Sequence, residues 1–384
     1  MYERRLLSVL RKSRASLLLL GPRQVGKSTL LRELEPQLAF NLADPGVHRR
    51  FAARPESIRE LLAAQPPSTK TVLIDEVQRV PELLDALQVV LDEQPKRFRF
   101  LLSGSSARKL RRGGANLLPG RVVVHALHPL FERELADDFV LDRALAHGTL
   151  PATWTATDAS ERAELLQTYA DVYLREEIQA EALVRDLGGY SRMLDLVAAA
   201  SGTILNTSAL CRDAEIRYET ARRYLEILED TLVLLRIPAW SGSDRSSLVA
   251  HPKIFLFDTG VRNALLGRPL DKPLPDERGI LLEHFVAHEL HRRIGHAWRG
   301  TRLFHYRTKH GSEVDFVLEV DRELWGIEVK STRTARPGML SGLNAFAERS
   351  PRVKRRILLT LAEHKSRMGA VEVWPVRAFL ASLP

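Results

Sequence analysis

The feature that most constrains the fold is a glycine-rich octapeptide near the start of the chain, Gly21-Pro22-Arg23-Gln24-Val25-Gly26-Lys27-Ser28. It follows the apolar run Ser16 to Leu20 and opens a segment that we expect to be helical from Lys27. The pattern GxxxxGKS between a strand and a helix is typical of a P-loop: the glycines let backbone N–H groups approach phosphates, and the helix N-terminus favours their negative charge. In such a loop Lys27 would reach the β- and γ-phosphates, and Ser28 would bind magnesium. The sequence therefore predicts a site for ATP and Mg2+ formed by Gly21 to Thr29.

A second apolar run, Thr71 to Ile74, ends in the two carboxylates Asp75 and Glu76. Hydrolysis of a nucleoside triphosphate needs one group to hold the metal and another to activate the attacking water. Because the glycine loop lies upstream, Asp75 is the predicted metal ligand and Glu76 the predicted catalytic base, although an Asp-Glu pair after a strand is common on its own.

Two further positions are candidates for sensing the γ-phosphate. Ser103 follows the apolar run Phe98 to Leu102, and its hydroxyl would lie between Asp75 and the γ-phosphate if the two strands are neighbours; a simple Gly-Ser turn is the alternative. Arg121 precedes the run Val122 to Leu127 and would sense phosphate or act as an arginine finger in a neighbouring subunit of a homo-oligomer. The arginines that compete for this role are Arg108, Arg111 and Arg112.

The first 150 residues alternate apolar strands with amphipathic helices, the pattern of an α/β fold with a parallel sheet and helices on both faces. A chain of 384 residues is longer than one core usually supports, and we expect three domains, at 1–150, 151–245 and 246–384. The predicted strands of the first are Ser16 to Leu20, Ala39 to Leu42, Thr71 to Ile74, Phe98 to Leu102 and Val122 to Leu127.

The middle segment is predicted to be helical. Ala159 to Val197 has helical periodicity, and Leu205 to Leu235 is typical of two short helices and a longer one from Tyr218 to Asp230. This pattern resembles a winged helix-turn-helix, which would contact DNA or serve as a spacer or protein dock. The candidate DNA contacts here are Arg217, Arg222 and Arg223.

Two alternating strands near the C-terminus carry acidic residues and a lysine. Glu313 and Asp315 would share one face, while Glu328 and Lys330 would share another, and the two faces would converge. An Asp followed about a dozen residues later by ExK is similar to the PD-(D/E)xK nuclease core, in which acids such as Asp315 and Glu328 hold magnesium and the lysine orients water or steadies the phosphate. An edge hairpin with solvent-facing charges is the alternative.

The helix predicted from Gly279 to Ile294 precedes these strands and carries a further acid, Glu283. His284 and His288 lie one helical turn apart beside it. Because no other His or Cys has matching spacing, we expect both histidines to be structural.

Together these motifs resemble the AAA-type ATPases of bacteria and archaea that carry a C-terminal domain of unknown function. The resemblance covers nearly the whole chain and implies an AAA-type core, a winged helix and a restriction-endonuclease-like α/β domain, to whose catalytic acids Glu283 would belong. The matching segments include Ile74 to Gln78, Leu101 to Ser106, Gly120-Arg121, His128 to Leu130, Tyr173-Leu174, Phe257 to Gly260 and Glu313 to Ser331.

A net charge of +9 and an isoelectric point near 9.8 favour a polyanionic partner such as DNA. Arg299 and Arg307 lie in a basic and aromatic stretch that would suit a nucleic-acid groove or form a solvated basic face. The single cysteine excludes an intramolecular disulfide and suggests the cytoplasm, and no apolar run approaches the length of a membrane span.

The sequence thus predicts an ATP-hydrolysing protein that acts on DNA and has a magnesium-dependent, nuclease-like C-terminal domain. The alternative is an ATP-dependent regulatory switch or scaffold for a protein partner, in which the set Asp315, Glu328 and Lys330 is inactive.

Overall fold

The computed structural model describes residues 2–105, 118, 120–174, 186–241, 248–268, 272–296, 298 and 300–384. The chain divides into two compact units. The first comprises Met1–Leu130 with Glu226–Val233, and the second comprises Phe131–Leu225 with Leu234–Pro384. Within the described ranges, no helix is long and apolar enough to cross a membrane.

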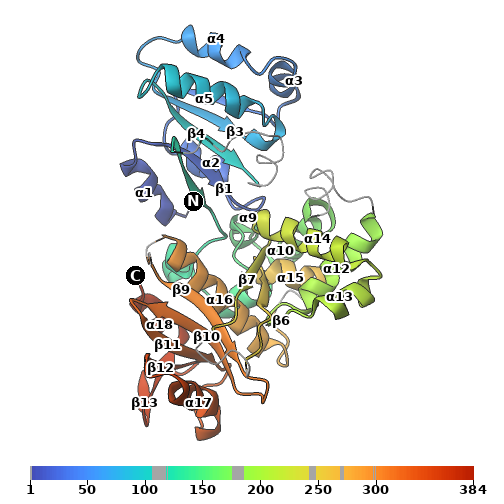
Figure 1. Ribbon diagram of the computed structural model, residues 1–384, viewed down its shortest axis with the longest axis vertical. Helices are drawn as coiled ribbons and strands as arrows, with labels where there is room; N and C mark the ends of the chain where they lie inside the picture. Colours follow the sequence, from blue (N-terminus) through green and yellow to red (C-terminus); the bar gives the residue numbers. More distant parts are fainter. Residues whose placement is uncertain are drawn as a thin grey trace. The chain divides into compact units, whose positions relative to one another are not determined.

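The first unit is built on a five-stranded parallel sheet with the strand order β2-β3-β4-β1-β5 (Figure 1). The strands are β1 Ser16–Leu20, β2 Leu38–Asn41, β3 Thr71–Asp75, β4 Arg99–Gly104 and β5 Val122–Ala126. Each strand overlaps the apolar run predicted for it, and the predicted α/β class of this unit is confirmed. The strands that carry Asp75 and Ser103 are neighbours, which is the condition that the interpretation of Ser103 required.

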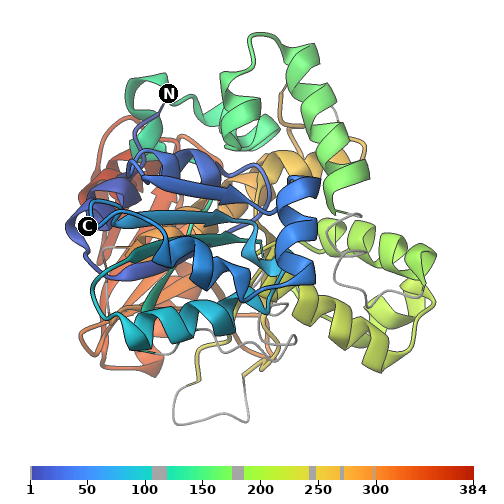
Figure 2. The ribbon, with the colours of Figure 1, turned by 90° about the horizontal axis from the view of Figure 1, so that it is seen from above.

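The helices of the first unit bury their apolar sides against this sheet. They are α1 Arg5–Lys12, α2 Lys27–Arg32, α3 Pro45–Ala53, α4 Ser57–Ala63 and α5 Leu83–Glu93. Leu84 and Leu87 of α5 belong to one core cluster with Ile74 and Phe100 of the central strands. Figure 1 and Figure 2 show α4 beside α5, and Ile58 and Leu62 of α4 extend the same core.

The second unit begins with helices around a small antiparallel sheet of order β6-β8-β7. The strands are β6 Thr203–Ile204, β7 Leu234–Ile237 and β8 Lys253–Leu256. The helices are α7 Glu132–Leu135, α8 Leu141–His147, α9 Pro151–Thr155, α10 Ala159–Thr168, α12 Leu187–Ala199, α13 Thr207–Ala214, α14 Tyr218–Asp230 and α15 Thr259–Leu265.

The helical predictions for this segment need two corrections. Ala159 to Val197 is not one helix: α10 passes into a π-helical turn at Tyr169–Tyr173, and α12 begins anew after Asp186, whose carboxylate accepts from the Gly189 N–H at 2.9 Å. Leu205 to Leu235 contains one short helix before the long one, not two. The left-handed backbone of Glu215, at φ 56°, ends α13, and Leu234 already belongs to β7.

The C-terminal part of the second unit is a six-stranded mixed sheet with the order β13-β14-β12-β11-β10-β9 (Figure 1). Val317 packs on Leu343 and Phe346, so helix α17 covers one face, while Phe316 contacts Phe255, which contacts His284 of α16 on the other face. The strands are β9 Arg302–Arg307, β10 Glu313–Val320, β11 Glu323–Val329, β12 Val353–Thr360, β13 Ser366–Met368 and β14 Val371–Pro375, and the helices are α16 Arg278–His296, α17 Ser341–Arg349 and α18 Val376–Ser382.

Candidate functional site

The glycine-rich loop joins β1 to α2 in the first unit, as its pattern predicts. A Cβ on Gly21 would lie 2.4 Å from the carbonyl oxygen of Leu127, and Gly26 has φ 92°, so both positions need glycine. The buried ammonium of Lys27 donates to the carbonyl oxygens of Gly21 at 2.8 Å and Pro22 at 2.9 Å. Ser28 and Thr29 lie half-buried and exposed, respectively, on the first turn of α2.

The two carboxylates after β3 meet the predicted sensor serine. The hydroxyl of Ser103 donates to Asp75 and accepts from the backbone N–H of Glu76 at 3.1 Å. Because β4 lies between β3 and β1, Ser103 stands between the strand of Asp75 and the strand that leads into the glycine loop. Glu76 has left-handed backbone at φ 60° and ψ 42°, a conformation that costs energy for a non-glycine residue.

Two residues that sequence reasoning missed complete this arrangement. The side-chain amide of Gln78 donates to Glu76 at 2.6 Å and to Ser105 at 3.2 Å. The buried guanidinium of Arg4 donates to the carbonyl oxygens of Val25 at 2.8 Å and His128 at 2.5 Å, and so ties the glycine loop to the segment after β5. The sequence could have indicated Gln78, because it lies two residues after Glu76 in the motif. No local pattern distinguishes Arg4 from its neighbour Arg5.

The structure does not bring Arg121 to the nucleotide site of its own chain, and the prediction that it senses phosphate there is corrected. Parallel strands run in one direction, and Ser16 pairs with Val122, so Arg121 lies at the amino end of β5. The glycine loop follows the carboxyl end of β1, roughly 15 Å away along a five-residue strand. Arg121 instead forms an ion pair with Asp92 of α5 at 2.6 Å. The competing arginines Arg108, Arg111 and Arg112 lie outside the described residues.

In the second unit the predicted C-terminal acids come together near the start of β10 and the end of β11. Asp315 is buried and accepts from the backbone N–H of Val329 at 2.8 Å, while Lys330 forms an ion pair with Glu328 at 2.6 Å. Glu283 reaches the same cluster from α16 through a lysine that the sequence did not single out. That lysine, Lys253 of β8, is buried and pairs with Glu283, with Asp315 at 3.5 Å and with Glu313 at 3.9 Å.

Burial and mutual repulsion raise the pKa values of two acids in this cluster, Glu283 and Glu328. Burial raises the pKa of Glu283 to about 8, and the charge of Asp315 adds to this against the attraction of Lys253. Burial also raises the pKa of Glu328 to about 7, with a further contribution from Asp315 and a partial offset by Lys330. Burial alone would lower the pKa of Lys253, but Glu283 and Asp315 outweigh it and raise that pKa.

The donors present are compatible with a magnesium ion held by few protein ligands. Glu328 Oε2 is buried and accepts no hydrogen bond, and it belongs to the same electrostatic cluster as Asp315. Among the described residues, no group of three or more His, Cys, Asp or Glu side chains is placed to hold a metal. A protein commonly supplies one or two carboxylates to Mg2+, and water or substrate phosphate completes the shell.

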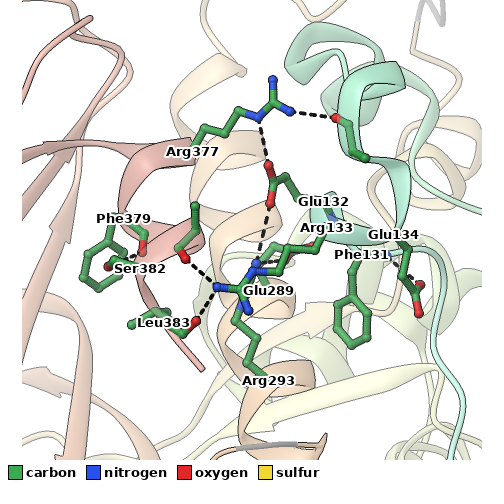
Figure 3. Close-up of polar contacts among 12 residues, drawn as sticks. Phe131, Glu132, Arg133, Glu134, Glu289, Arg293, Arg377, Phe379, Ser382 and Leu383 are labelled. Carbon is green, nitrogen blue, oxygen red and sulfur yellow. Dashed lines mark hydrogen bonds and ion pairs between the residues drawn. The ribbon is translucent and has the colours of Figure 1, made fainter. Parts of the chain in front are cut away.

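The helix that carries Glu283 is anchored by a buried ion-pair network (Figure 3). Glu289 accepts from the backbone N–H of Glu132 at 3.1 Å and from Arg293 at 3.1 Å. Glu132 in turn pairs with Arg377 of α18 at 2.8 Å, and Arg133 donates to the carbonyl oxygens of Ala381 and Leu383. The start of the second unit is therefore tied both to α16 and to the C-terminal helix.

His284 and His288 both bind the carbonyl oxygen of Leu256 through Nε2, and both side chains are buried. His284 also contacts Ser201 and the rings of Phe255 and His288, so the two histidines tie α16 to β8. In the described part of the chain they belong to no group of three or more side chains placed to hold a metal.

The predicted nucleic-acid contacts are dispersed. Arg217 and Arg222 are exposed at the start of α14, and Arg223 is half-buried on the same helix. Arg307 is exposed at the end of β9 and pairs with Glu313 at 3.3 Å. Arg299 lies outside the described residues.

Comparisons with known proteins match three successive parts of the chain. Residues 13–136 match the family described as AAA domain, residues 139–272 match a domain of unknown function, DUF8612, and residues 278–379 match a domain of unknown function, DUF4143. The chain therefore contains an AAA-type ATPase domain followed by a C-terminal DUF4143 domain, and the match supports ATP binding and hydrolysis by the first unit.

Curated relatives include the uncharacterized proteins Rv2008c of Mycobacterium tuberculosis and Mb2031c of Mycobacterium bovis. Each is 29% identical over 324 residues, covering 83% of this chain and 70% of the relative. Similar solved structures include a variant of RuvB from Thermotoga maritima, with 16% identity, coverage of 60% of this chain and 87% of that one, and a TM-score of 0.31. The STAND protein PH0952 from Pyrococcus horikoshii has 12% identity, coverage of 76% and 46%, and a TM-score of 0.24.

Proposed function

We propose that this protein hydrolyses ATP while acting on DNA, and that its C-terminal domain is a magnesium-dependent, nuclease-like module. The AAA-type domain and the P-loop support the ATPase activity. The observation that supports action on DNA is the gathering of Asp315, Glu328 and Lys330 where the interior strand β10 begins and its neighbour β11 ends, with Glu283 reaching them through Lys253.

At the nucleotide site, each predicted residue has a distinct task. Lys27 would exchange the carbonyl oxygens of Gly21 and Pro22 for phosphate oxygens when ATP enters. Ser28 and Asp75 would hold Mg2+, which neutralises charge on the phosphates. Glu76 would take a proton from the attacking water, and Ser103 would fix Asp75 and the Glu76 backbone relative to one another.

At the C-terminal cluster, Asp315 and Glu328 would hold Mg2+, which supplies Lewis-acid and water-activating chemistry. Lys330 would steady the phosphate, since its ammonium lies 2.6 Å from Glu328 and is partly exposed. Glu283, whose pKa is raised to about 8, would exchange a proton near neutral pH.

Helices α12, α13 and α14 with the sheet β6-β8-β7 support a winged-helix module that contacts DNA. Its contacts would include Arg217, Arg222 and Arg223, and Arg307 would contact DNA from β9. Arg121 would act only in trans, as an arginine finger in a homo-oligomer.

One observation favours the alternative, a regulatory switch or scaffold for a protein partner. Lys253 already supplies a positive charge between Glu283 and Asp315, and a buried lysine can replace a metal as the structural counter-ion of two carboxylates. In that case ATP binding would control assembly and the C-terminal cluster would only stabilise the domain.

Turnover of ATP and cleavage of DNA, measured in the same tubes with single-stranded, duplex and branched DNA, test the proposal. The variants are Lys27→Ala, Glu76→Gln and Asp315→Asn, with Glu348→Gln as a control because Glu348 is exposed on α17. We expect DNA to stimulate ATP turnover, Lys27→Ala and Glu76→Gln to abolish it, and Asp315→Asn to abolish cleavage alone. If no DNA changes turnover and none is cut, the DNA function is wrong and the switch is favoured.

A further inference from the structure

A cavity of about 640 Å3 lies in the second unit, where the start of α13, the strand β7 and the turn after β9 approach one another. It is lined by three cationic side chains, Arg236, Arg307 and Lys309, and all three are exposed. None of the described residues that line it is acidic. A cavity with this charge is suited to a polyanion.

The uncharged residues of the lining include groups that can bind the phosphate of a nucleotide and a ring that can stack on its base. The hydroxyls of Thr207 and Ser208 lie at the start of α13, where backbone N–H groups also favour phosphate. Tyr218 lines the cavity with 55% of its surface exposed, although large aromatic side chains are normally buried. An exposed ring beside phosphate-binding groups is the arrangement on which proteins stack the bases of single strands.

The cavity borders the acidic cluster directly. Arg307 lines the cavity and pairs with Glu313 at 3.3 Å, and Glu313 in turn lies 3.9 Å from Lys253. His251 and Pro252 also line the cavity, and the next residue along the chain is Lys253, which contacts Glu283 and Asp315. A strand held in the cavity would therefore lie beside Glu313, which is linked through Lys253 to Glu283 and Asp315.

We propose that this cavity binds an unstacked nucleotide of single-stranded DNA and thereby leads the adjoining phosphodiester to the acidic cluster, an inference that rests on the proposed function. Arg236, Arg307 and Lys309 bind the phosphates, and Tyr218 stacks on the base. The volume is that of a small-molecule pocket, so it is large enough for one splayed nucleotide.

Binding of a fluorescein-labelled oligothymidylate to the full chain, measured by fluorescence anisotropy in EDTA, tests this proposal without cleavage. For the double variant Arg236→Ala with Lys309→Ala we expect affinity to fall about tenfold or more, and the slope of log affinity against log salt to fall by about one per removed cation. Tyr218→Ala should weaken binding about tenfold, and Tyr218→Phe should bind like wild type because it keeps the ring. The control is Lys354→Ala, which removes an exposed cation of β12 outside this lining.

Three outcomes separate this proposal from the proposed function. If the cavity variants weaken binding and Asp315→Asn binds normally but nothing is cut, the cavity is confirmed and the nuclease activity is wrong. If the variants fold by thermal unfolding yet bind as tightly as wild type, the cavity is not the strand site, even where cleavage occurs. Duplex DNA binding better than oligothymidylate, with the same sensitivity to the variants, would also overturn the single-strand assignment.

Discussion

The hydroxyl of Ser103 donates a hydrogen bond to the carboxylate of Asp75, across two neighbouring strands of the parallel sheet. The same oxygen accepts from the Glu76 N–H at 3.1 Å and so holds that residue in its left-handed conformation. One serine thus holds the carboxylate of Asp75 and the backbone of Glu76, the two residues that the ATPase proposal needs after β3.

Replacing Ser103 by alanine should therefore lower the kcat of ATP hydrolysis by about ten- to a hundredfold, the usual effect of losing a group that orients a metal ligand. The KM for ATP should change little, because the Ser103 hydroxyl bonds Asp75 and the Glu76 N–H and, within the described ranges, neither the glycine loop nor Lys27. Ser105→Ala is the matched control: Ser105 is also buried and directly follows β4, but among the described residues its hydroxyl accepts from Gln78 and contacts neither Asp75 nor the Glu76 N–H. Equal losses of kcat in both variants would show that packing at the end of β4, and not the hydrogen bond to Asp75, accounts for the effect.

Arg4 fixes the glycine loop through the carbonyl oxygens of Val25 and His128. Arg4→Met keeps the aliphatic stem but leaves these acceptors without the guanidinium, at a cost of about 1–3 kcal/mol for a buried group. We expect a KM for ATP raised about tenfold and a lower midpoint of thermal unfolding that saturating ATP partly restores. Arg5→Met, at the exposed neighbouring position, should change neither quantity, and an unchanged KM in Arg4→Met would remove Arg4 from the site.

Local patterns predicted the parts of the fold that depend on contiguous residues. The glycine loop, the strand before Asp75 and the helix Tyr218–Asp230 all lie where their spacing placed them, because each is specified within one segment. Arg121 was misplaced for the opposite reason. Its sequence neighbours indicate a strand, but only the pairing of β5 with β1 shows which end of the sheet it occupies.

Residues that reach a site from distant segments of the chain were not predicted. Lys253 belongs to β8, which pairs with β6 and β7, yet its ammonium reaches acids of α16 and β10. In sequence it is one lysine beside a proline, and its role arises only from burial among carboxylates. The start of α12 was also not predicted, since Asp186 caps this helix through a hydrogen bond to the Gly189 N–H that periodicity does not reveal.

The network around Glu289 should be sensitive to the loss of one partner (Figure 3). Glu289→Leu leaves Arg293 buried with only the more distant Glu132, at 3.7 Å, and should destabilise the second unit by about 3–5 kcal/mol. Adding Arg293→Leu removes the uncompensated charge and should recover part of this loss. Urea denaturation measures both, with the exposed pair of Arg54 and Glu60 as control, where Arg54→Ala should cost less than about 1 kcal/mol. If the loss in free energy of unfolding of the double variant equals the sum of the losses of the two single variants, Glu289 and Arg293 are not coupled.

The buried histidines of α16 should make folding stability depend on pH. Burial lowers the pKa of His284 to about 3, helped by the charges of Arg262 and Arg292 against the hydrogen bond to Leu256, and burial likewise holds the pKa of His288 well below its usual value. Because the unfolded chain binds these protons near pH 6.5 and the folded chain does not, the stabilisation is complete above pH 6.5 and is lost as the pH falls toward 3.

Each histidine should therefore remove about 2 kcal/mol of stability between pH 6.5 and pH 5. His288→Gln keeps a donor for the carbonyl oxygen of Leu256 but cannot titrate, so its free energy of unfolding should fall less steeply over this interval. His364→Gln, at an exposed position, should follow wild type. Denaturant titrations at closely spaced pH values provide the measurement, and identical slopes for His288→Gln and wild type would mean that the pKa of His288 is the same in the folded and unfolded chains.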